Sequence, residues 1–328
     1  MRAVYIENFG SVDGLEVREI AGPASPTGDE VMVRVRTVGL NRADLLQVRG
    51  LYPPPAGYSP NRPGLEFAGE IVEIGDAVKD WRIGTRVFGI AAGETQAEFL
   101  ISDRRLLAPI PDRLSFIEAA CIPEVFITAH DALRTLGDLG THQSLLIHAV
   151  GSGVGLAALQ LAKSWDALVI GTSRTEDKIR RCEAFGIDVG ITVWDASSFA
   201  DRVTDATHGR GVDVILDLVG GAYFPENLKC LAPLGRMIQV GLTAGRKAEI
   251  DLGLVLQKRA RIIGTTMRPR SLEEKALATE RFAGDALDLL ASGAIVPNLD
   301  RSFPVSEVQE AYRYLESNEN FGKVVLEF

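Results

Sequence analysis

Residues 148–155 read HAVGSGVG, and this stretch decides the fold. It follows an apolar run over residues 144–147 and precedes a helical pattern over residues 156–162. A strand, a glycine-rich turn and a helix in this order begin a βαβ unit, and the N-terminus of such a helix can bind a phosphate group. The stretch therefore suggests a nucleotide-binding site.

The spacing of the three glycines excludes two other motifs. A P-loop needs Lys-Ser/Thr directly after its last glycine, whereas Leu156 and Ala157 follow here. A nucleophile elbow needs glycines two residues before and after its serine, whereas Val150 and Val154 occupy those positions. A modified dinucleotide fingerprint remains.

Aligned on its last glycine, that fingerprint places Val150 and Ser152 where its first two glycines stand. Gly155 keeps the position at which strand and helix pack most closely, and the small Ser152 still lets the backbone approach a pyrophosphate. The alternative is a purely structural turn. The predicted cofactor-binding residues of this loop are Gly151, Ser152, Gly153, Val154 and Gly155.

The next strand pattern indicates which dinucleotide binds. NAD-binding chains carry an Asp or Glu about 20 residues beyond the loop, where it accepts a hydrogen bond from the ribose 2′-OH. Here the sequence IGTSRTEDK places Ser173, Arg174 and Lys178 in this region. Such side chains can bind a 2′-phosphate, which a carboxylate would repel. The sequence therefore favours NADPH. The alternative is that Arg174 and Lys178 lie on a solvated helix face.

The middle of the chain alternates strand and helix patterns with short connections. This alternation predicts an α/β fold with a doubly wound parallel sheet. The expected strands cover residues 144–150, 167–173, 190–194, 212–219, 236–241 and 261–265, and the expected helices cover 155–165, 176–185, 197–207 and 224–231.

Both ends of the chain favour a second, β-rich domain. Strand patterns cover residues 1–5, 30–36, 69–75, 86–90 and 323–328, and helices with capping boxes are expected over 271–292, from Ser271 and Glu274, and over 306–316, from Ser306 and Gln309. Residues 51–63 contain five prolines and must form a loop. We expect a β-rich domain of residues 1–122 and 267–328, into which an α/β domain of residues 123–266 is inserted.

Composition and charge exclude several classes of protein. The chain is 46% hydrophobic and 24% charged, as globular domains are. Its net charge of −9, without a basic run, argues against a nucleic-acid partner. Cys121, Cys182 and Cys230 lie too far apart for a Cys-x-x-Cys site. Neither a signal peptide nor a membrane span is expected, so we expect a cytoplasmic protein with free thiols.

Over nearly its full length the chain resembles the medium-chain dehydrogenase/reductase superfamily. The resemblance rests on TVGLNRADLLQVRG, RPGLEFAGEIVEIG, HAVGSGVGLAALQLA, CLAPLGRMIQVG and NENFGKVVLEF. It is strongest to the zinc-independent NADPH:quinone oxidoreductases of the zeta-crystallin type, including the subgroup of the tumour-suppressor-induced enzyme. The resemblance implies a Rossmann-type unit inserted into a GroES-like substrate domain, and a homodimer.

The resemblance also bears on zinc. Zinc alcohol dehydrogenases of this superfamily carry a cysteine ligand at the position of Asn41 and a histidine ligand at the position of Leu65. Neither Asn41 nor Leu65 suits zinc, and the cysteine-rich lobe that holds structural zinc in those enzymes is missing. We therefore expect no metal.

Without a Lewis acid, hydride transfer to an electrophilic, conjugated acceptor is favoured over alcohol oxidation. By resemblance to the substrate pocket of the family, Asn41 and Tyr52 are the candidate catalytic donors to the oxyanion that develops. The residues themselves leave alternatives open. Asn41 could cap the helix that begins at Arg42, and Tyr52 could serve only packing.

Further cofactor contacts are implied by the resemblance alone. They are Thr128, near the nicotinamide end, Gly241 after the strand MIQV, and Asn320, Gly322 and Lys323 in the tail. One departure concerns Val193, which stands where family members often carry a tyrosine on the 2′-phosphate side.

We expect a zinc-independent, NADPH-dependent reductase of quinones or related conjugated carbonyls. An enoyl or alkenal double-bond reductase would use the same pocket and cofactor. The alternative that is not an enzyme is an NADPH-binding, crystallin-like protein with little turnover. Steady-state NADPH oxidation with a panel of acceptors separates these three.

Overall fold

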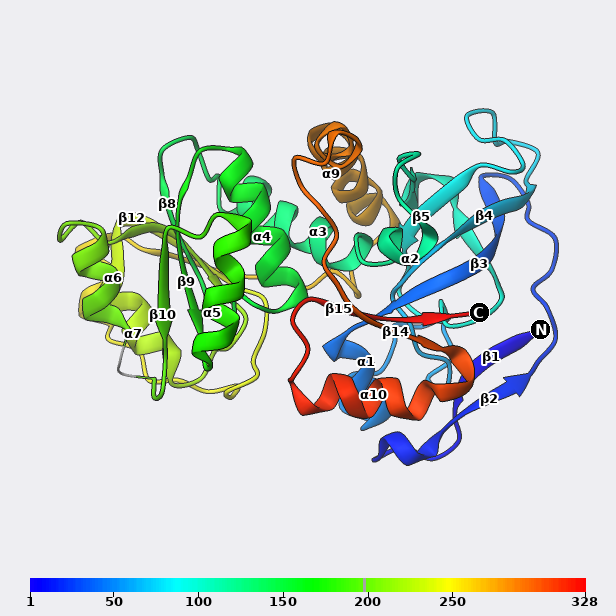
Figure 1. Cartoon of the computed structure of the whole chain (residues 1–328), viewed down its shortest axis with the longest axis horizontal. Coiled ribbons are helices and arrows are strands. Elements are labelled where there is room, and N and C mark those ends of the chain that lie inside the picture. The colour runs from blue at the N-terminus through cyan, green and yellow to red at the C-terminus, as the bar shows by residue number, and fades with distance from the viewer. Residues whose placement is uncertain (197–198) are drawn as a thin grey trace. The chain divides into compact units, whose positions relative to one another are not determined.

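Figure 1 shows the computed structural model, which describes residues 1–196 and 199–328. The chain divides into two compact units. Unit 1 comprises Met1–Ile127 and Met267–Phe328, and unit 2 comprises Thr128–Thr266. The first division falls within helix α3 (Pro123–His130), a few residues after the boundary expected at 122/123.

Unit 2 is built on a parallel sheet. In the described part of the chain its strands lie in the order β10-β9-β8-β11-β12-β13, and every neighbouring pair is parallel. This order, 3-2-1-4-5-6 along the unit, is the doubly wound Rossmann order and confirms the expected fold class. The strands are β8 (Ser144–Ile147), β9 (Leu168–Ser173), β10 (Val189–Thr192), β11 (Val212–Asp217), β12 (Leu231–Gln239) and β13 (Arg261–Gly264).

The helices of unit 2 connect these strands, and Figure 1 shows α4 and α5 running in front of the sheet. All four residues of β8 are buried, as an apolar run between two helical layers requires. The helices are α4 (Gly153–Ser164), α5 (Glu176–Cys182), α6 (Ala200–Ala206), α7 (Tyr223–Cys230) and α8 (Leu252–Lys258). Our expected helix 197–207 begins at Ser197, which with Ser198 lies outside the described residues.

One strand of unit 2 differs from the expectation. We expected it over 236–241, but β12 begins at Leu231, which pairs with Val212, and ends at Gln239. The register shifts between Val212 and Val214, and this bulge accommodates Pro233 inside the strand. The expected strand therefore began too late and ended two residues beyond the observed one.

Unit 1 joins the two ends of the chain in one sheet. Its strands lie in the order β14-β15-β3-β4-β5-β7, with β6 on β3, and a separate pair is formed by β1 and β2. The last strand lies antiparallel to β3, with Val325 opposite Gly39, which confirms the β-rich domain made from both ends. The strands are β1 (Arg2–Ile6), β2 (Leu15–Glu19), β3 (Glu30–Leu40), β4 (Glu66–Ile74), β5 (Arg86–Ile90), β6 (Phe99–Asp103), β7 (Leu107–Pro109), β14 (Leu299–Pro304) and β15 (Lys323–Glu327).

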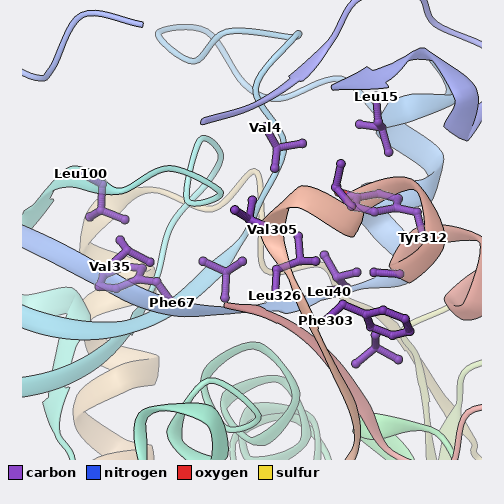
Figure 2. Packing of buried hydrophobic residues seen from close by; sticks show 14 of the residues in the cluster. Val4, Leu15, Val35, Leu40, Phe67, Leu100, Phe303, Val305, Tyr312 and Leu326 are labelled. Atoms are coloured by element: carbon purple, nitrogen blue, oxygen red, sulfur yellow. The ribbon is translucent and has the colours of Figure 1, made fainter. Parts of the chain in front are cut away.

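A hydrophobic cluster holds this unit together. Figure 2 shows side chains from the start of the chain, such as Val4 and Leu15, beside Phe303, Tyr312 and Leu326 from its end. Burying each such side chain adds about 1.5–3 kcal/mol to the free energy of unfolding. The returning segment is therefore part of the core of unit 1.

The helices of unit 1 are α1 (Arg42–Val48), α2 (Phe116–Ala119), α9 (Leu272–Ser292) and α10 (Val308–Ser317). The capping box predicted from Ser271 and Glu274 is confirmed at α9. The box predicted from Ser306 and Gln309 is wrong. A short 3₁₀ turn, Val305–Glu307, follows β14, so α10 begins later, and the Gln309 amide donates to the carbonyl of Leu15 (2.8 Å).

Candidate cofactor site and buried polar cluster

The glycine-rich loop of unit 2 turns sharply between β8 and α4. Ala149 has φ +51°, and the Ser152 N–H donates to its carbonyl oxygen (2.9 Å). Ser152 is the N-cap of α4, and its Oγ accepts from the Gly155 N–H (3.2 Å). The Ser152 amide is thus used within the loop. The first-turn amides of α4 have no acceptor inside the helix and are directed toward this end.

Gly155 fixes how closely the loop and α4 pack. A Cβ atom at this position would lie 2.6 Å from the carbonyl oxygens of both Ala149 and Val150. Only glycine fits there, which is the packing role expected of the last glycine of the fingerprint. Val150 is fully buried, whereas Ser152, Gly153 and Val154 are partly exposed at the helix end. The residues present therefore fit a dinucleotide phosphate.

A buried polar chain that the sequence analysis missed lies beside this loop. The ring of His148 contacts Thr172 Oγ1 (2.8 Å) and Asn227 Oδ1 (2.6 Å), and the Asn227 amide donates to Asp217 (3.0 Å). Burial lowers the pKa of His148, so its ring is neutral. The sequence held one signal for this polar chain. His148 directly follows strand β8, and Asp217 is the last residue of β11, which pairs with β8. Asp217 also accepts the N–H groups of Val219 and Gly220.

The three residues predicted to read the 2′-phosphate lie at the end of β9 and the start of α5. Ser173 is buried, with Oγ accepting from the Thr175 N–H (3.4 Å), whereas Arg174 is exposed and Lys178 partly exposed. Burial raises the pKa of Tyr223, and the positive charge of Arg174 partly opposes this shift, so Arg174 lies near that phenol. Val193 is buried and pairs by its N–H with the Ser173 carbonyl (2.9 Å).

Thr128 and Gly241 are the other candidate contacts of unit 2. Thr128 lies in α3 and is partly exposed. Gly241 lies just beyond β12, where a Cβ atom would be 2.5 Å from the carbonyl oxygen of Leu218. The backbone at Gly241 is therefore held against the end of β11.

Asn41 in unit 1 lies at the N-cap of α1, and its backbone N–H donates to Asp44 Oδ2 (2.8 Å). Its side chain is part of a buried network. The amide Nδ2 donates to Glu66 Oε1 (2.7 Å), and Oδ1 accepts from Lys323 Nζ (2.8 Å). The structure thus joins Asn41 to Lys323, a residue that we predicted for a different role.

Glu66 is the centre of this network. Its carboxylate, with no exposed surface, accepts from Asn41, from Lys323 Nζ (2.6 Å) and, through Oε2, from the Glu124 N–H at the start of α3 (2.8 Å). The side chain of Lys323 also donates to the Leu40 carbonyl (2.6 Å). All three donors of the ammonium therefore have acceptors within unit 1.

Two further carboxyl groups lie near this centre. Burial raises the pKa of Asp44 to about 6, although the Asn41 N–H and the charges of Arg268 and Lys323 oppose the shift. Burial, together with the negative charge of Glu66, raises the pKa of Glu124 to about 8. Glu124 therefore carries a proton at neutral pH. The charged groups around it are the carboxylates of Glu66 and Asp44 and the cations of Lys323 and Arg268.

Tyr52 lies in the loop of residues 51–63, which contains no helix or strand, as expected. Its side chain is partly exposed, and burial raises the pKa of the phenol, so it remains a hydroxyl donor. The guanidinium of Arg268 lies over its ring, 5.2 Å from the centroid.

The tail residues form a tight turn before β15. The Asn320 amide donates to the Gly322 carbonyl (2.8 Å), and Gly322 has φ +98°. A Cβ atom on Gly322 would lie 2.4 Å from the carbonyl oxygen of Asn298. Packing alone therefore requires this glycine, and the cofactor contacts of the tail remain predictions.

The two positions that hold zinc ligands in zinc-dependent relatives form no metal site here. Leu65 is buried and apolar, and Asn41 is bonded as described. Among residues 1–196 and 199–328, no group of three His, Cys, Asp or Glu side chains could hold a metal ion. Over the same residues, none of the helices has the length and apolar character needed to cross a membrane.

Sequence reasoning missed most of the cluster in unit 1. Glu66 and Asp44 were not among the predicted site residues. Arg268 and Gln47 were not considered. One feature indicated that the Glu66 carboxylate is buried. Glu66 is the first residue of β4, and the three residues that follow it are all buried.

The parallel sheet of unit 2, with its glycine-rich turn between β8 and α4, is of the dinucleotide-binding type. Residues 27–112 match the alcohol dehydrogenase GroES-like domain, and residues 153–284 match the zinc-binding dehydrogenase family. The quinone oxidoreductase-like protein 2 homolog of Nematostella vectensis is 32% identical over 90% of this chain and 81% of its own length. The chain belongs to the medium-chain dehydrogenase/reductase superfamily.

In other relatives, the region that matches the whole chain is a small part of a much longer protein. A phenolphthiocerol/phthiocerol polyketide synthase component of Mycobacterium tuberculosis is 31% identical over 98% of this chain, which spans only 14% of that protein. Among solved structures, Escherichia coli quinone oxidoreductase complexed with NADPH has TM-score 0.89 and 26% identity, covering all of both chains. The CurK enoyl reductase has TM-score 0.86 and 26% identity, over 99% of this chain and 98% of its own.

Proposed function

We propose that the chain is an NADPH-dependent reductase of quinones or related conjugated carbonyls that works without a metal. The observation that carries the proposal is the Asn41 side chain, held by Glu66 and Lys323 where zinc-dependent members have a cysteine ligand. A carboxamide at that position can donate a hydrogen bond to an oxyanion but cannot replace a Lewis acid.

In unit 2, the end of α4 and the loop of residues 149–155 would hold the pyrophosphate of the cofactor. Ser173, Arg174 and Lys178 would bind the 2′-phosphate, and this assignment supports NADPH over NADH. Thr128, Gly241 and the tail residues Asn320 and Gly322 would complete the cofactor contacts. The Lys323 ammonium, which we had also expected to contact the cofactor, donates instead to Leu40, Asn41 and Glu66. When bound, NADPH supplies a hydride.

In unit 1, Asn41 and Tyr52 would meet the oxygen of the acceptor. One N–H of the Asn41 amide is directed to Glu66 at 2.7 Å, whereas its contact with the Gly39 carbonyl is long, at 3.5 Å. The second N–H is thus the one that can turn to a substrate oxygen. The Tyr52 hydroxyl, kept protonated by its raised pKa, would be the second donor.

The same donors suit an enoyl reductase, and this is the second candidate. In favour of it are the similarity to a polyketide synthase component and the likeness to the CurK enoyl reductase. An enoyl thioester accepts hydride at the β-carbon, and its carbonyl oxygen gains the negative charge that Asn41 and Tyr52 would stabilise.

Steady-state oxidation of NADPH and NADH with a panel of acceptors tests the proposal. The panel contains ortho- and para-quinones, alkenals and enoyl thioesters. We expect turnover of quinones with NADPH, and a loss of kcat on the order of 10²-fold in Tyr52→Phe and in Asn41→Ala. Thioester turnover alone would favour the enoyl reductase. Tight NADPH binding without any turnover would leave the crystallin-like role and remove both enzyme proposals.

A homodimer would be formed through unit 2. The edge strand β13 and helix α8 expose large apolar side chains, since Ile262, Leu252 and Leu256 are 41%, 68% and 78% exposed. An exposed strand edge with such neighbours favours pairing with a second copy. Sedimentation equilibrium should give a dimer for the parent protein and a monomer for Leu256→Glu. A monomeric parent protein would contradict the proposal.

We propose a cytoplasmic location. In support of it, Cys121, Cys182 and Cys230 are buried free thiols, which are usual in reducing compartments.

A further inference from the structure

Arg268 is the second residue of the segment that returns to unit 1, and it is only 3% exposed. Its guanidinium donates to three acceptors on three separate segments. Nε donates to the Ala92 carbonyl (2.8 Å), Nη1 to the Tyr52 carbonyl (2.8 Å) and Nη2 to Gln47 Oε1 (2.5 Å). A buried guanidinium requires acceptors, and here one comes from the loop of residues 51–63 and two from neighbouring segments.

Through Gln47, the contacts of Arg268 reach the C-terminal end of the loop of residues 51–63. Gln47 lies in α1 with no exposed surface, and its Nε2 donates to the Pro60 carbonyl (2.8 Å) and, at 3.4 Å, to that of Arg62. Arg268 and Gln47 together therefore bind the loop of residues 51–63 near its first residues and near its last ones.

The segment after β5 holds the middle of the same loop. Glu94 accepts from the Ser59 N–H (2.5 Å) and pairs with Arg62 (2.5 Å), and Tyr58 packs against Gly93. Because Arg268 Nε binds Ala92, the guanidinium ties this segment to Tyr52 as well. The guanidinium also lies over the Tyr52 ring, where a desolvated cation interacts favourably with the aromatic face.

We propose that Arg268 is a positioning residue that fixes the Tyr52 hydroxyl through the Tyr52 carbonyl and ring. The proposal rests on the proposed function, in which Tyr52 donates to the acceptor oxygen. The loop has no helix or strand of its own, so its shape depends on such anchors. Through these contacts with the loop, Arg268 would act on the reaction by way of Tyr52.

The first test measures the loop without reference to activity. Hydrogen–deuterium exchange is compared between the parent protein, Arg268→Met and the control Arg113→Met. Arg113 donates to the Leu290 carbonyl (3.0 Å) elsewhere in unit 1, so its removal also costs a guanidinium–carbonyl contact. Faster exchange across residues 51–63 in Arg268→Met, but not in Arg113→Met, is expected. Unchanged exchange across this loop overturns the proposal.

The second test is a kinetic double-mutant cycle with Tyr52→Phe, which keeps the ring and the backbone carbonyl. Arg268→Met should lower kcat/KM for the acceptor on the order of tenfold to a hundredfold, with an unchanged Kd for NADPH. In the Tyr52→Phe background the same change should have little further effect. Equal losses in both backgrounds overturn the positioning role.

Two further variants keep the test decisive if Arg268→Met does not fold. Arg268→Lys keeps the charge but lacks the fork that reaches three acceptors. Gln47→Glu keeps an acceptor for Arg268 but removes the donor to Pro60 and Arg62. Both should speed exchange in the loop and lower kcat/KM, and normal behaviour of both overturns the proposal. If the parent protein turns over no acceptor, the proposed function falls, and the exchange rates alone decide whether Arg268 holds the loop.

Discussion

Lys323 Nζ lies 2.6 Å from Glu66 Oε1, and the two side chains are only 4% and 0% exposed. Lys323 is the first residue of β15, and Glu66 is the first residue of β4. Lys323 also binds Asn41, so this ion pair fixes the carboxamide that we assign to the acceptor. The pair therefore links the stability of unit 1 to the geometry of the candidate active site.

Removal of Lys323 should be strongly destabilising. In Lys323→Met the Glu66 carboxylate would stay buried without its cation, and such losses cost about 3–5 kcal/mol of unfolding free energy. Urea unfolding followed by circular dichroism measures the loss. The double variant Lys323→Met/Glu66→Gln should recover part of it, because no uncompensated charge remains.

Lys229→Met is the matched control, since Lys229 pairs with Glu226 while its side chain is 58% exposed. Water already solvates that ammonium, so the unfolding midpoint should hardly change. Equal effects of the two lysine substitutions would contradict the importance assigned to the buried pair.

The fold was predictable because its signals are local. The turn at residues 148–155, the strand and helix periods around it and the box at Ser271 each lie within a few residues of one another. The box at Ser306 failed for a tertiary reason, since Gln309 donates to the Leu15 carbonyl on another strand. Local patterns do not report such partners.

The candidate site was predictable only in part. Asn41 and Tyr52 came from resemblance, but the residues that hold them are distant in sequence. Glu66 and Lys323 are 257 positions apart, and Gln47 and Arg268 are 221 apart. A single sequence contains no signal that brings such pairs together, so the network had to come from the structure.

Arg174 should discriminate between the two nicotinamide cofactors. Arg174→Ala removes a charged donor to the 2′-phosphate, so KM for NADPH should rise by about tenfold to a hundredfold while KM for NADH hardly changes. Arg180→Ala is the control, because Arg180 lies on the adjoining helix α5 and pairs with Asp177. A similar rise for both cofactors would remove the assigned role of Arg174.

Glu124 should make the protein less stable as the pH rises. Its pKa is about 8 when folded, against an ordinary value of 4.5, so between these pH values the folded state keeps a proton that the unfolded state has released. The unfolding free energy must then fall as pH increases through this window. Asp44, with a pKa of about 6, adds to the fall only below that pH.

Glu124→Gln should therefore flatten the dependence above pH 6, and it should be more stable than the parent protein at pH 8. Urea midpoints at pH 5, 6, 7 and 8 measure this. Glu118→Gln is the opposite control. Hydrogen bonds from Ser115 lower the pKa of Glu118, so that carboxylate stabilises the fold above its ordinary pKa, and the substitution should cost stability at pH 7. A parallel pH dependence of the parent protein and Glu124→Gln would contradict the assignment.

Two helix glycines with opposite surroundings test the packing of the dinucleotide loop. In Gly155→Ala the new Cβ would meet two carbonyl oxygens at 2.6 Å, so the loop must move, at about 1–3 kcal/mol of unfolding free energy. Gly284 lies in α9 with open space around its Cβ position, so Gly284→Ala should stabilise by about 0.5–1 kcal/mol. Because the moved loop would hold the pyrophosphate, Gly155→Ala should also weaken NADPH binding, measured by fluorescence titration, whereas Gly284→Ala should not. If Gly155→Ala is as stable as the parent protein and binds NADPH equally well, the close contact between loop and helix does not set the site.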